Sequence, residues 1–270
     1  MFFIVQYPWL YDSRGIRAYM GRGPAPLAGE RKYGIRGGTM SIILGAALLP
    51  PLFLMWKVYQ NDTIEKEPTG LLVKIFVFGM ISTIPAVILE TIGQTVLEGV
   101  LGIPQGRVFN LLMFFIVVAG AEELVKYFAM KLPTWRNENF NYVFDGVVYG
   151  VAAALGFAAL ENVLYVLDGG LATAGMRALT SIPIHCICGV YMGHYYGIAK
   201  AADYHGEKAA CGKMKLRAFL IPILIHGAYD FIVSDPEEML ILLFLIYVII
   251  IDVFAIRSLK KYSKFDVRIF

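Results

Sequence analysis

Charged residues are scarce in this sequence. Aspartate, glutamate, lysine and arginine together make up 17% of its 270 residues, whereas hydrophobic residues reach 58%. A soluble domain usually carries about 25% charged residues, so the composition excludes an ordinary soluble domain as the main part of the chain. A helix that crosses a bilayer needs about 20 residues, and seven such helices with short loops use most of the chain. The sequence therefore predicts a membrane protein with no separate soluble domain of ordinary size.

Cysteine is scarce as well. Cys186 and Cys188 fall in one apolar segment, and Cys211 falls in a basic loop. This arrangement predicts no disulfide framework. The sequence also lacks internal repeats, low-complexity tracts and coiled-coil heptads.

Long apolar runs are abundant instead. They predict transmembrane helices at residues 40–57, 71–92, 108–130, 144–167, 173–199, 217–234 and 238–257. The predicted fold class is all-α, a polytopic transmembrane helix bundle with about seven spans. In the fourth span, Gly146, Gly150 and Ala154 recur every four positions, which places small residues on one helical face. Such a face allows a neighbouring helix to pack closely in lipid.

The distribution of lysine and arginine predicts the orientation in the membrane. The loops after spans one, three and five and the C-terminal tail are rich in basic residues, whereas the loops after spans two, four and six carry only Arg107 and Arg177. Because basic loops stay in the cytoplasm, we expect a multi-pass membrane protein whose first span begins outside. Its C-terminus, with a basic tail at residues 258–270, is predicted to be cytoplasmic.

Residues 1–39 fit this orientation poorly, because they are basic yet precede a span that begins outside. The basic residues are Arg14, Arg17, Arg22, Arg31, Lys32 and Arg36. Two interpretations are open: a translocated or interfacial extension, or a natural start at Met40. We favour the start at Met40, and we expect residues 1–39 to lie outside the core transmembrane domain, which covers residues 40–257.

Two adjacent glutamates, Glu122 and Glu123, lie inside the third predicted span. An ionised carboxylate costs at least about 2.5 kcal/mol at the centre of a transmembrane helix. Lys126 follows them by four and three residues, so it can pair with either glutamate on the same helical face. Ionisable residues at this depth usually face the bundle interior and serve a function, although they could also form an ion cluster that holds helices together.

Other spans carry polar residues at comparable depth. Glu161 lies four residues after Phe157 in the fourth span, His185 lies in the fifth, and His226 lies four residues before Asp230 in the sixth. Because residues four apart share a helical face, each pair can point toward the bundle interior. At about 1.5 Å per residue, their distances from the predicted helix ends place these groups in the middle and outer half of the bilayer. We therefore expect them to converge.

Carboxylates and imidazoles that converge in a cavity are suited to activating water. A buried glutamate can take a proton from water as it attacks a carbonyl group, and a histidine can stabilise the developing oxyanion. Asp230 could fix the tautomer of His226. More ordinary roles are also open, with Glu161 as a helix cap, His185 bonded to backbone carbonyls and Phe157 as packing.

Three motifs at these positions resemble those of the PrsW family of intramembrane proteases. This family is part of a wider group that contains the CAAX-prenyl endopeptidases and the bacteriocin-processing CPBP proteins. The motifs are EExxK at Glu122–Lys126, FxxxE at Phe157–Glu161 and HxxxD at His226–Asp230, with His185 between the last two. The similarity covers roughly residues 40–257.

The resemblance implies a helical intramembrane endopeptidase of a bacterial or archaeal inner (cytoplasmic) membrane, with a protease domain that covers residues 40–257. Glu122 looks like the water-activating carboxylate of such a protease, and Glu123 looks like its essential neighbour. His185 and His226 look like the groups that polarise the substrate and bind the oxyanion. By the same resemblance, Glu161 and Asp230 are further catalytic candidates. Lys126 and Phe157 are supporting residues.

The resemblance also implies a substrate class. The best-known family members cleave a membrane-anchored anti-sigma factor on its extracytoplasmic side during envelope stress. Family resemblance leaves open whether a glutamate-bound water acts alone or zinc takes part. If zinc is present, the candidate ligands are Glu122, Glu161, His185 and His226. We expect the lipid bilayer and a membrane-anchored protein substrate as partners, and no nucleic acid.

Two other functions are open from the residues. An ion- or proton-coupled transporter could use the same buried glutamates, lysine and histidines as a proton relay. The absence of repeats with broken helices counts against it. A non-catalytic membrane scaffold could retain the same fold, and the intact Glu122, His185 and His226 count against that function.

Overall fold

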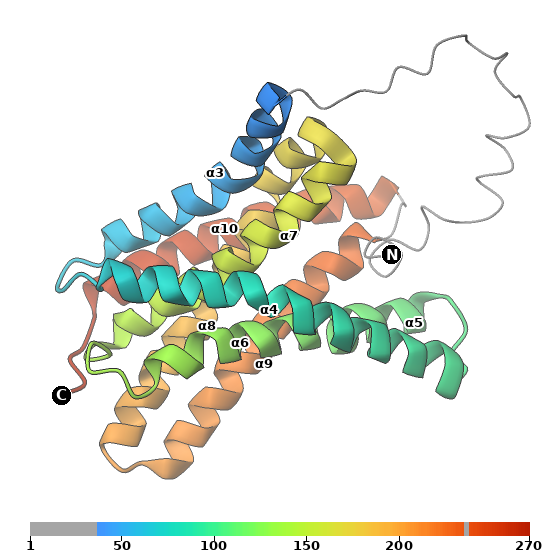
Figure 1. The fold of residues 1–270 in the computed structure, drawn as a ribbon. Coiled ribbons are helices and arrows are strands. Elements are labelled where there is room, and N and C mark those ends of the chain that lie inside the picture. The colour runs from blue at the N-terminus through green and yellow to red at the C-terminus, as the bar shows by residue number, and fades with distance from the viewer. Residues whose placement is uncertain (1–36, 235–237) are drawn as a thin grey trace, which may run out of the picture.

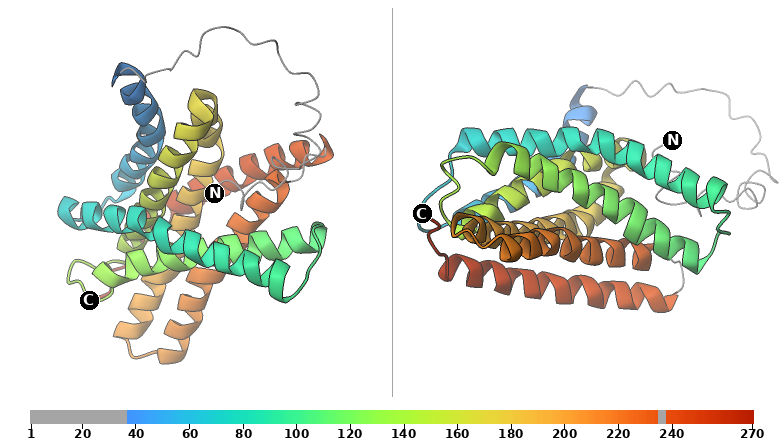
Figure 2. Two further views of the ribbon diagram at one scale, coloured as in Figure 1. Left: turned by 45° about the vertical axis from the view of Figure 1, so that its right-hand side comes forward. Right: turned by 90° about the horizontal axis from the view of Figure 1, so that it is seen from below.

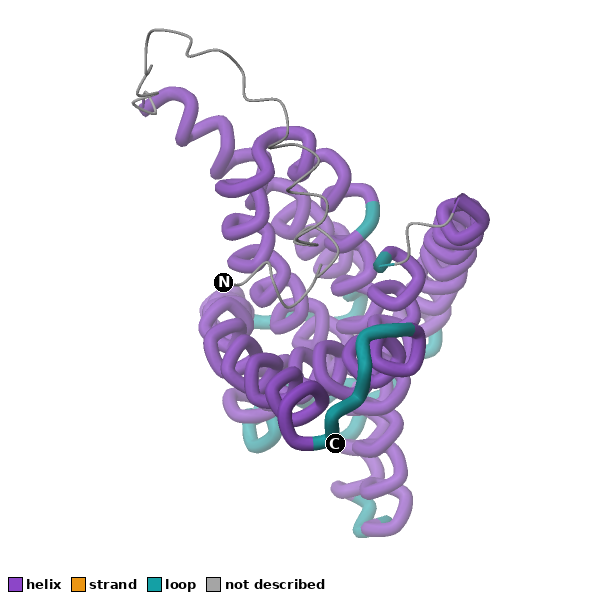
Figure 3. The backbone as a smooth tube through the Cα atoms, turned by 90° about the vertical axis from the view of Figure 1, so that its right-hand side faces the viewer, coloured by secondary structure: helices purple, strands orange, loops and turns teal. Residues whose placement is uncertain are grey.

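The computed structural model describes residues 37–234 and 238–270. Within these ranges the chain is a bundle of helices without a strand (Figures 1 and 3). The helical segments are α3 (Gly37–Asn61), α4 (Thr69–Thr95), η2 (Val96–Val100), α5 (Arg107–Leu112), η3 (Met113–Val118), α6 (Ala119–Thr134), α7 (Val143–Leu179), α8 (Ser181–Tyr204), α9 (Lys208–Val233) and α10 (Glu238–Lys264). Because the description begins at residue 37, the predictions about residues 1–39 fall almost wholly outside it.

The predicted all-α transmembrane bundle is confirmed. Within the described ranges, the segments long and apolar enough to cross a membrane are Met40–Asn61, Thr69–Val100, Arg107–Thr134, Val143–Tyr204 and Lys208–Val233. The fourth segment contains two helices, α7 and α8, and α10 is not among the five. The predicted number of seven spans is therefore approximate.

The outer surface of the bundle is apolar, as a bilayer requires. Ile81, Ile84 and Ile88 of α4 are exposed, and exposed leucine, isoleucine and valine side chains also line α3, α9 and α10. A soluble protein rarely shows apolar surface of this extent. In lipid it is the favourable outer face, and the helices satisfy their own backbone hydrogen bonds. The chain is therefore a multi-pass membrane protein.

Helix α7 lies at the centre of the bundle, where it packs against α3, α4, α6 and α8 (Figures 1 and 2). Every residue from 144 to 159 is buried. A Cβ atom added to Gly150 would lie 2.4 Å from the backbone oxygen of Gly189, and one added to Gly146 would lie 2.5 Å from that of Gly193. The predicted close packing along the small-residue face is thus confirmed, and α8 runs antiparallel to α7.

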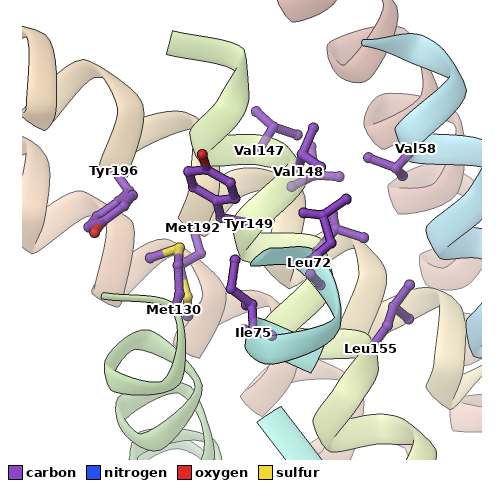
Figure 4. Close-up of a cluster of buried hydrophobic side chains, with 14 of the residues drawn as sticks. Val58, Leu72, Ile75, Met130, Val147, Val148, Tyr149, Leu155, Met192 and Tyr196 are labelled. Atoms are coloured by element: carbon purple, nitrogen blue, oxygen red, sulfur yellow. The ribbon is translucent and has the colours of Figure 1, made fainter. Parts of the chain in front are cut away.

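The main hydrophobic cluster joins α3, α4, α6, α7 and α8 (Figure 4). Tyr149 of α7 and Tyr196 of α8 are fully buried in it, beside Ile75 of α4 and Met130 of α6. The ring of Phe140 stacks on Tyr196 with centroids 5.2 Å apart and meets Tyr149 edge-on. This packing fixes the relative positions of α6, α7 and α8, which also carry predicted polar residues.

The end of α7 differs from the prediction. Gly170 has a φ of 71° and a ψ of −164°, which breaks the helical path. Arg177 then contacts Glu161, 16 residues earlier, although 16 residues of straight helix would span about 24 Å. The segment after Gly170 therefore folds back along α7. Arg177 was expected in an outer loop and is instead buried, because its guanidinium pairs with Glu161.

The π-helical segment η3 positions the start of α6. It packs against α4 and α9 where glycines leave space, with Val117 beside Gly93 and Phe115 beside Gly227. A Cβ atom on Gly227 would lie 2.6 Å from the Phe115 ring. Because His226 precedes Gly227, this close approach brings α9 against the helical stretch that carries Glu122.

Candidate active site

The candidate active site lies in the interior of the bundle, where α6, α7, α8 and α9 meet. Each of the seven polar residues predicted for it is at most 5% exposed. They are Glu122, Glu123, Lys126, Glu161, His185, His226 and Asp230. The structure brings all of them into one connected network, although they come from four successive helices and are spread over residues 122–230.

Lys126 connects the two glutamates to α8. Its Nζ atom lies 2.9 Å from Glu122 Oε2 and 2.9 Å from Glu123 Oε1. It also lies 3.0 Å from His185 Nδ1 and 4.2 Å from the centre of the Phe157 ring. The ammonium therefore balances two buried carboxylates, and the aromatic face beneath it adds a cation–π contact.

The contacts of His185 define its tautomer. An ammonium group can only donate, so Nδ1 accepts from Lys126 and the proton of a neutral ring is on Nε2. Nε2 donates to Glu161 Oε2 at 2.9 Å. The Phe157 ring packs 5.9 Å from the imidazole ring and limits its rotation.

Glu161 is part of a second group of contacts that the sequence did not reveal. Arg177 donates to Glu161 Oε2 at 2.8 Å and, through Nε, to Asn162 Oδ1 at 2.9 Å. Asn162 in turn donates to the backbone oxygen of Ala47 in α3 at 2.7 Å. One sequence signal was present, because Arg177 is one of only two basic residues assigned to the predicted outer loops after spans two, four and six.

His226 of α9 faces both glutamates. Its Nδ1 atom lies 2.9 Å from Glu123 Oε1, while its Nε2 atom lies 3.8 Å from Glu122 Oε2 and 3.4 Å from Asp230 Oδ2. The His226 and His185 rings meet edge-on with centroids 5.0 Å apart. Glu123 Oε2 and Asp230 Oδ2 are buried and have no hydrogen-bond partner among the described residues. These two oxygens are the uncommitted polar atoms of the site.

Glu90 of α4 is a further carboxylate near this network, and the sequence analysis missed it. It is 8% exposed and lies close enough to interact electrostatically with Glu122, Glu161 and Asp230. An acidic residue inside an apolar predicted span was the signal that could have identified it, as it did for Glu122.

Three residues of the network fit a metal ion. Glu122, His185 and His226 each offer one ligand atom, and these atoms all lie within 4.8 Å of one another. Two imidazoles and one carboxylate are a ligand set that zinc takes in hydrolytic enzymes. Each histidine also gives its other nitrogen to a carboxylate, Glu161 or Glu123, which is the usual arrangement around metal-bound histidine. Glu161, the fourth predicted ligand, contacts His185 and Arg177 instead.

Comparisons with known proteins agree with this geometry. Residues 67–256 match the family described as "PrsW family intramembrane metalloprotease". Protease PrsW of Shouchella clausii is 31% identical over 228 residues, which cover 84% of this chain and all of that protein. Protease PrsW of Bacillus subtilis is 30% identical over 222 residues, covering 82% of this chain and 96% of the relative. Protease PrsW of Clostridioides difficile is 30% identical over 228 residues, covering 83% and 92%.

No solved structure gives a significant match to this chain. The sequence relatives, by contrast, are matched over nearly their full length. This extent supports the protease prediction over the transporter and scaffold alternatives. The chain belongs to the PrsW family of intramembrane proteases.

Proposed function

We propose that the chain hydrolyses a peptide bond of a membrane-anchored protein at the centre formed by Glu122, His185 and His226. The observation that carries this proposal is the convergence of their three ligand atoms, from α6, α8 and α9, within 4.8 Å in a buried site. Structural ion pairs in membrane helices need only opposite charges, whereas this site also gathers two imidazoles, each of which gives one nitrogen to a carboxylate and turns the other toward the centre. Such a set is suited to water activation.

The ligand set leads us to propose zinc as the cofactor, held by Glu122, His185 and His226. When bound, zinc would act as a Lewis acid that polarises the scissile carbonyl group and makes water a better nucleophile at neutral pH. Glu161 and Glu123 would keep the two histidines in the tautomers that present their free nitrogens to the centre.

A base must take the proton of the attacking water. Two carboxylate oxygens face His226 Nε2, from Glu122 at 3.8 Å and from Asp230 at 3.4 Å. Glu122 is the base that the sequence predicts. If Glu122 is committed to a cation, Asp230 can take the proton through Oδ2, which has no hydrogen-bond partner among the described residues. Lys126 is the nearest cationic donor and is placed to stabilise negative charge that develops during attack.

We propose that cleavage takes place in the outer half of the membrane. In the fourth predicted span, Glu161 lies about 26 Å of helix from the cytoplasmic end at residue 144 and about 9 Å from the outer end at residue 167, while His226 lies near the middle of the sixth span. With the C-terminus in the cytoplasm, the site is therefore nearer the outer surface of the inner membrane. A membrane-anchored anti-sigma factor that is cut on its extracytoplasmic side matches this depth. We therefore propose such a factor as the substrate and a role for the protein in the response to envelope stress.

The cleavage product tests this proposal. The purified protein would be reconstituted in liposomes with a single-pass anti-sigma factor, and the new termini would be identified by mass spectrometry. We expect one cut in the outer half of the substrate helix or just beyond it. A chelator should stop cleavage and added zinc should restore it. Cleavage only in the cytoplasmic half would contradict the proposed depth, and full activity in excess chelator would contradict zinc.

A further inference from the structure

A second cluster of buried carboxylates lies at the opposite end of α7 from the candidate active site. Asp62 and Glu67 belong to the connection between α3 and α4, and Asp145 belongs to the first turn of α7. They are 2%, 3% and 1% exposed. About 24 Å of helix separates Asp145 from Glu161, so the cluster is not part of the catalytic network.

The three carboxylates converge on one another. One oxygen from each lies within 4.8 Å of the other two. In the part of the chain that the structure describes, no lysine or arginine forms an ion pair with any of the three. The nearby Lys66 donates to the backbone oxygen of Tyr59 and acts on Asp62 only as a more distant charge.

Neutral donors satisfy the cluster only in part. Tyr149 donates to Glu67 Oε2 at 2.5 Å. The backbone N–H groups of Asn141 and Tyr142 donate to Asp145 Oδ2 at 2.9 and 2.6 Å. Asp62 Oδ2 is buried and accepts no hydrogen bond from the described residues. Asp62 is nearly fully buried, one of its oxygens has no hydrogen-bond partner among the described residues, and two other carboxylates lie close by, which leaves negative charge in need of a cation.

Burial is unfavourable for the two carboxylates of the α3–α4 connection, Asp62 and Glu67. Burial raises the pKa of Asp62 to about 6, with Lys66 partly opposing the rise, and burial raises the pKa of Glu67 to about 7. Neighbouring carboxylates, including Asp266 and Glu65, add to the unfavourable charge at Asp62. A bound divalent cation would offset both the cost of burying the carboxylates and the repulsion between them.

We propose that Asp62, Glu67 and Asp145 bind a divalent cation of the class that prefers oxygen ligands, such as Mg²⁺, Mn²⁺ or Ca²⁺. The donor set consists of carboxylates without nitrogen or sulfur, which is the set that these hard cations take. The site differs in this respect from the centre of Glu122, His185 and His226.

The cation has a structural role. It joins the α3–α4 connection to the start of α7, where the C-terminal tail also docks. Val143 donates to the backbone oxygen of Val267, and Phe144 donates to the Asp266 carboxylate. A cation at this point would fix the ends of three helices and the tail, and so would stabilise the bundle without taking part in hydrolysis.

Binding of Mn²⁺ to the purified full-length protein in detergent tests the site, with the loss of the free-ion electron paramagnetic resonance signal as the readout. The variants are Asp62→Asn, Glu67→Gln and, as a matched control, Glu65→Gln, whose carboxylate is in the same loop but exposed. His226→Ala removes one ligand of the other centre. We expect Mn²⁺ affinity to fall by at least about tenfold in Asp62→Asn and Glu67→Gln, because affinity follows the number of charged ligands. Competition with Mg²⁺ and Ca²⁺ identifies the preferred ion.

Thermal unfolding provides the second readout. Mg²⁺ or Ca²⁺ should raise the unfolding midpoint of the wild type, Glu65→Gln and His226→Ala, but not that of Asp62→Asn. Without a divalent cation, Asp62→Asn should unfold at the same or a higher temperature than the wild type, because it removes an unpaired buried charge. Binding by Asp62→Asn that equals the wild type would overturn the proposal. So would the absence of any response to all three ions, which would mean that the carboxyl groups only share protons.

Discussion

Each histidine of the candidate active site gives one ring nitrogen to a carboxylate and turns the other toward the centre. His185 uses Glu161 in this way, and His226 uses Glu123. The carboxylate sets both the tautomer and the angle of the ring, so the free nitrogen is presented in one direction. In the proposed mechanism, the chemistry of the site therefore depends on residues that need not touch the substrate.

Glu161→Gln tests this positioning role. Glutamine keeps the size of the side chain but weakens its hold on the imidazole N–H, so we expect activity to fall by about 10- to 100-fold with the fold retained. Arg177 would lose its ionic partner in the same variant. Glu98→Gln is the matched control, because Glu98 is exposed and bonds only to Gln94 and Gln105 among the described residues. Activity within twofold of the wild type in Glu161→Gln would contradict the role.

Lys126 occupies the atoms that a metal ion needs. Its ammonium bonds to Glu122 Oε2 and His185 Nδ1, which are among the proposed ligand groups. Binding of a cation therefore requires the ammonium to withdraw from at least one of them. In Lys126→Met the metal-free protein would contain uncompensated buried carboxylates, and we expect a loss of about 3–5 kcal/mol in the free energy of unfolding.

Zinc should restore much of that stability in Lys126→Met, and it should bind more tightly than to the wild type. Thermal unfolding in detergent with and without zinc measures both effects. Lys131→Met is the control, because Lys131 contacts only the rings of Tyr127 and Phe128 among the described residues. Equal stability of Lys126→Met and Lys131→Met in metal-free buffer would show that Lys126 does not balance the glutamates.

At the scale of residues, the sequence identified this buried polar cluster through its energetic cost. Glu122, Glu123 and Lys126 stood out because lipid tolerates few charges, and their spacing predicted the pairing that the structure contains. The contact between Arg177 and Glu161 could not be predicted from spacing, because it depends on the reversal of the chain at Gly170.

At the scale of helices, α7 and α8 set the distance between the two halves of the site. Glu161 lies on α7 and His185 on α8, so their 2.9 Å hydrogen bond requires the backbones to remain close. The glycines at positions 146, 150, 189 and 193 make this possible, because they allow backbone atoms of the two helices to touch.

Gly150→Ala is expected to push these helices apart. The added Cβ would lie 2.4 Å from a backbone oxygen, and a backbone atom in a packed core cannot give way cheaply. We expect a loss of about 1–3 kcal/mol in stability together with reduced activity. Gly45→Ala in α3 is the control, because its Cβ would meet no atom within 4 Å. A Gly150→Ala protein as stable and active as Gly45→Ala would contradict this account of the helix pair.

The boundaries of the helices were less predictable than their existence. The apolar runs identified the spans, yet the fifth predicted span, 173–199, is divided between the end of α7 and α8. Hydropathy cannot detect this break, because the residues on both sides of Thr180 are equally apolar. The backbone geometry of Gly170 and Thr180 decides it.

At the scale of the whole molecule, the orientation in the membrane determines whether the site lies nearer the outer or the cytoplasmic surface of the bilayer. Gln105 and Glu207 are exposed and lie in connections on opposite predicted sides, the first outside and the second in the cytoplasm. We expect a membrane-impermeant thiol reagent to label Gln105→Cys in intact cells and Glu207→Cys only after lysis. The native cysteines are buried, so the background should be low. The opposite labelling pattern would reverse the orientation and place the site nearer the cytoplasm.

The central claim is that Glu122, His185 and His226 form one hydrolytic centre, and cleavage rates test it most directly. The wild type, Glu122→Gln, His185→Ala and His226→Ala would be reconstituted with the same membrane-anchored substrate, with Glu98→Gln as the control for an exposed glutamate. We predict that each of the three centre variants loses at least about 100-fold in rate, that double variants lose no more than the worst single one, and that Glu98→Gln retains the wild-type rate. Cleavage by Glu122→Gln at the wild-type rate would contradict the account.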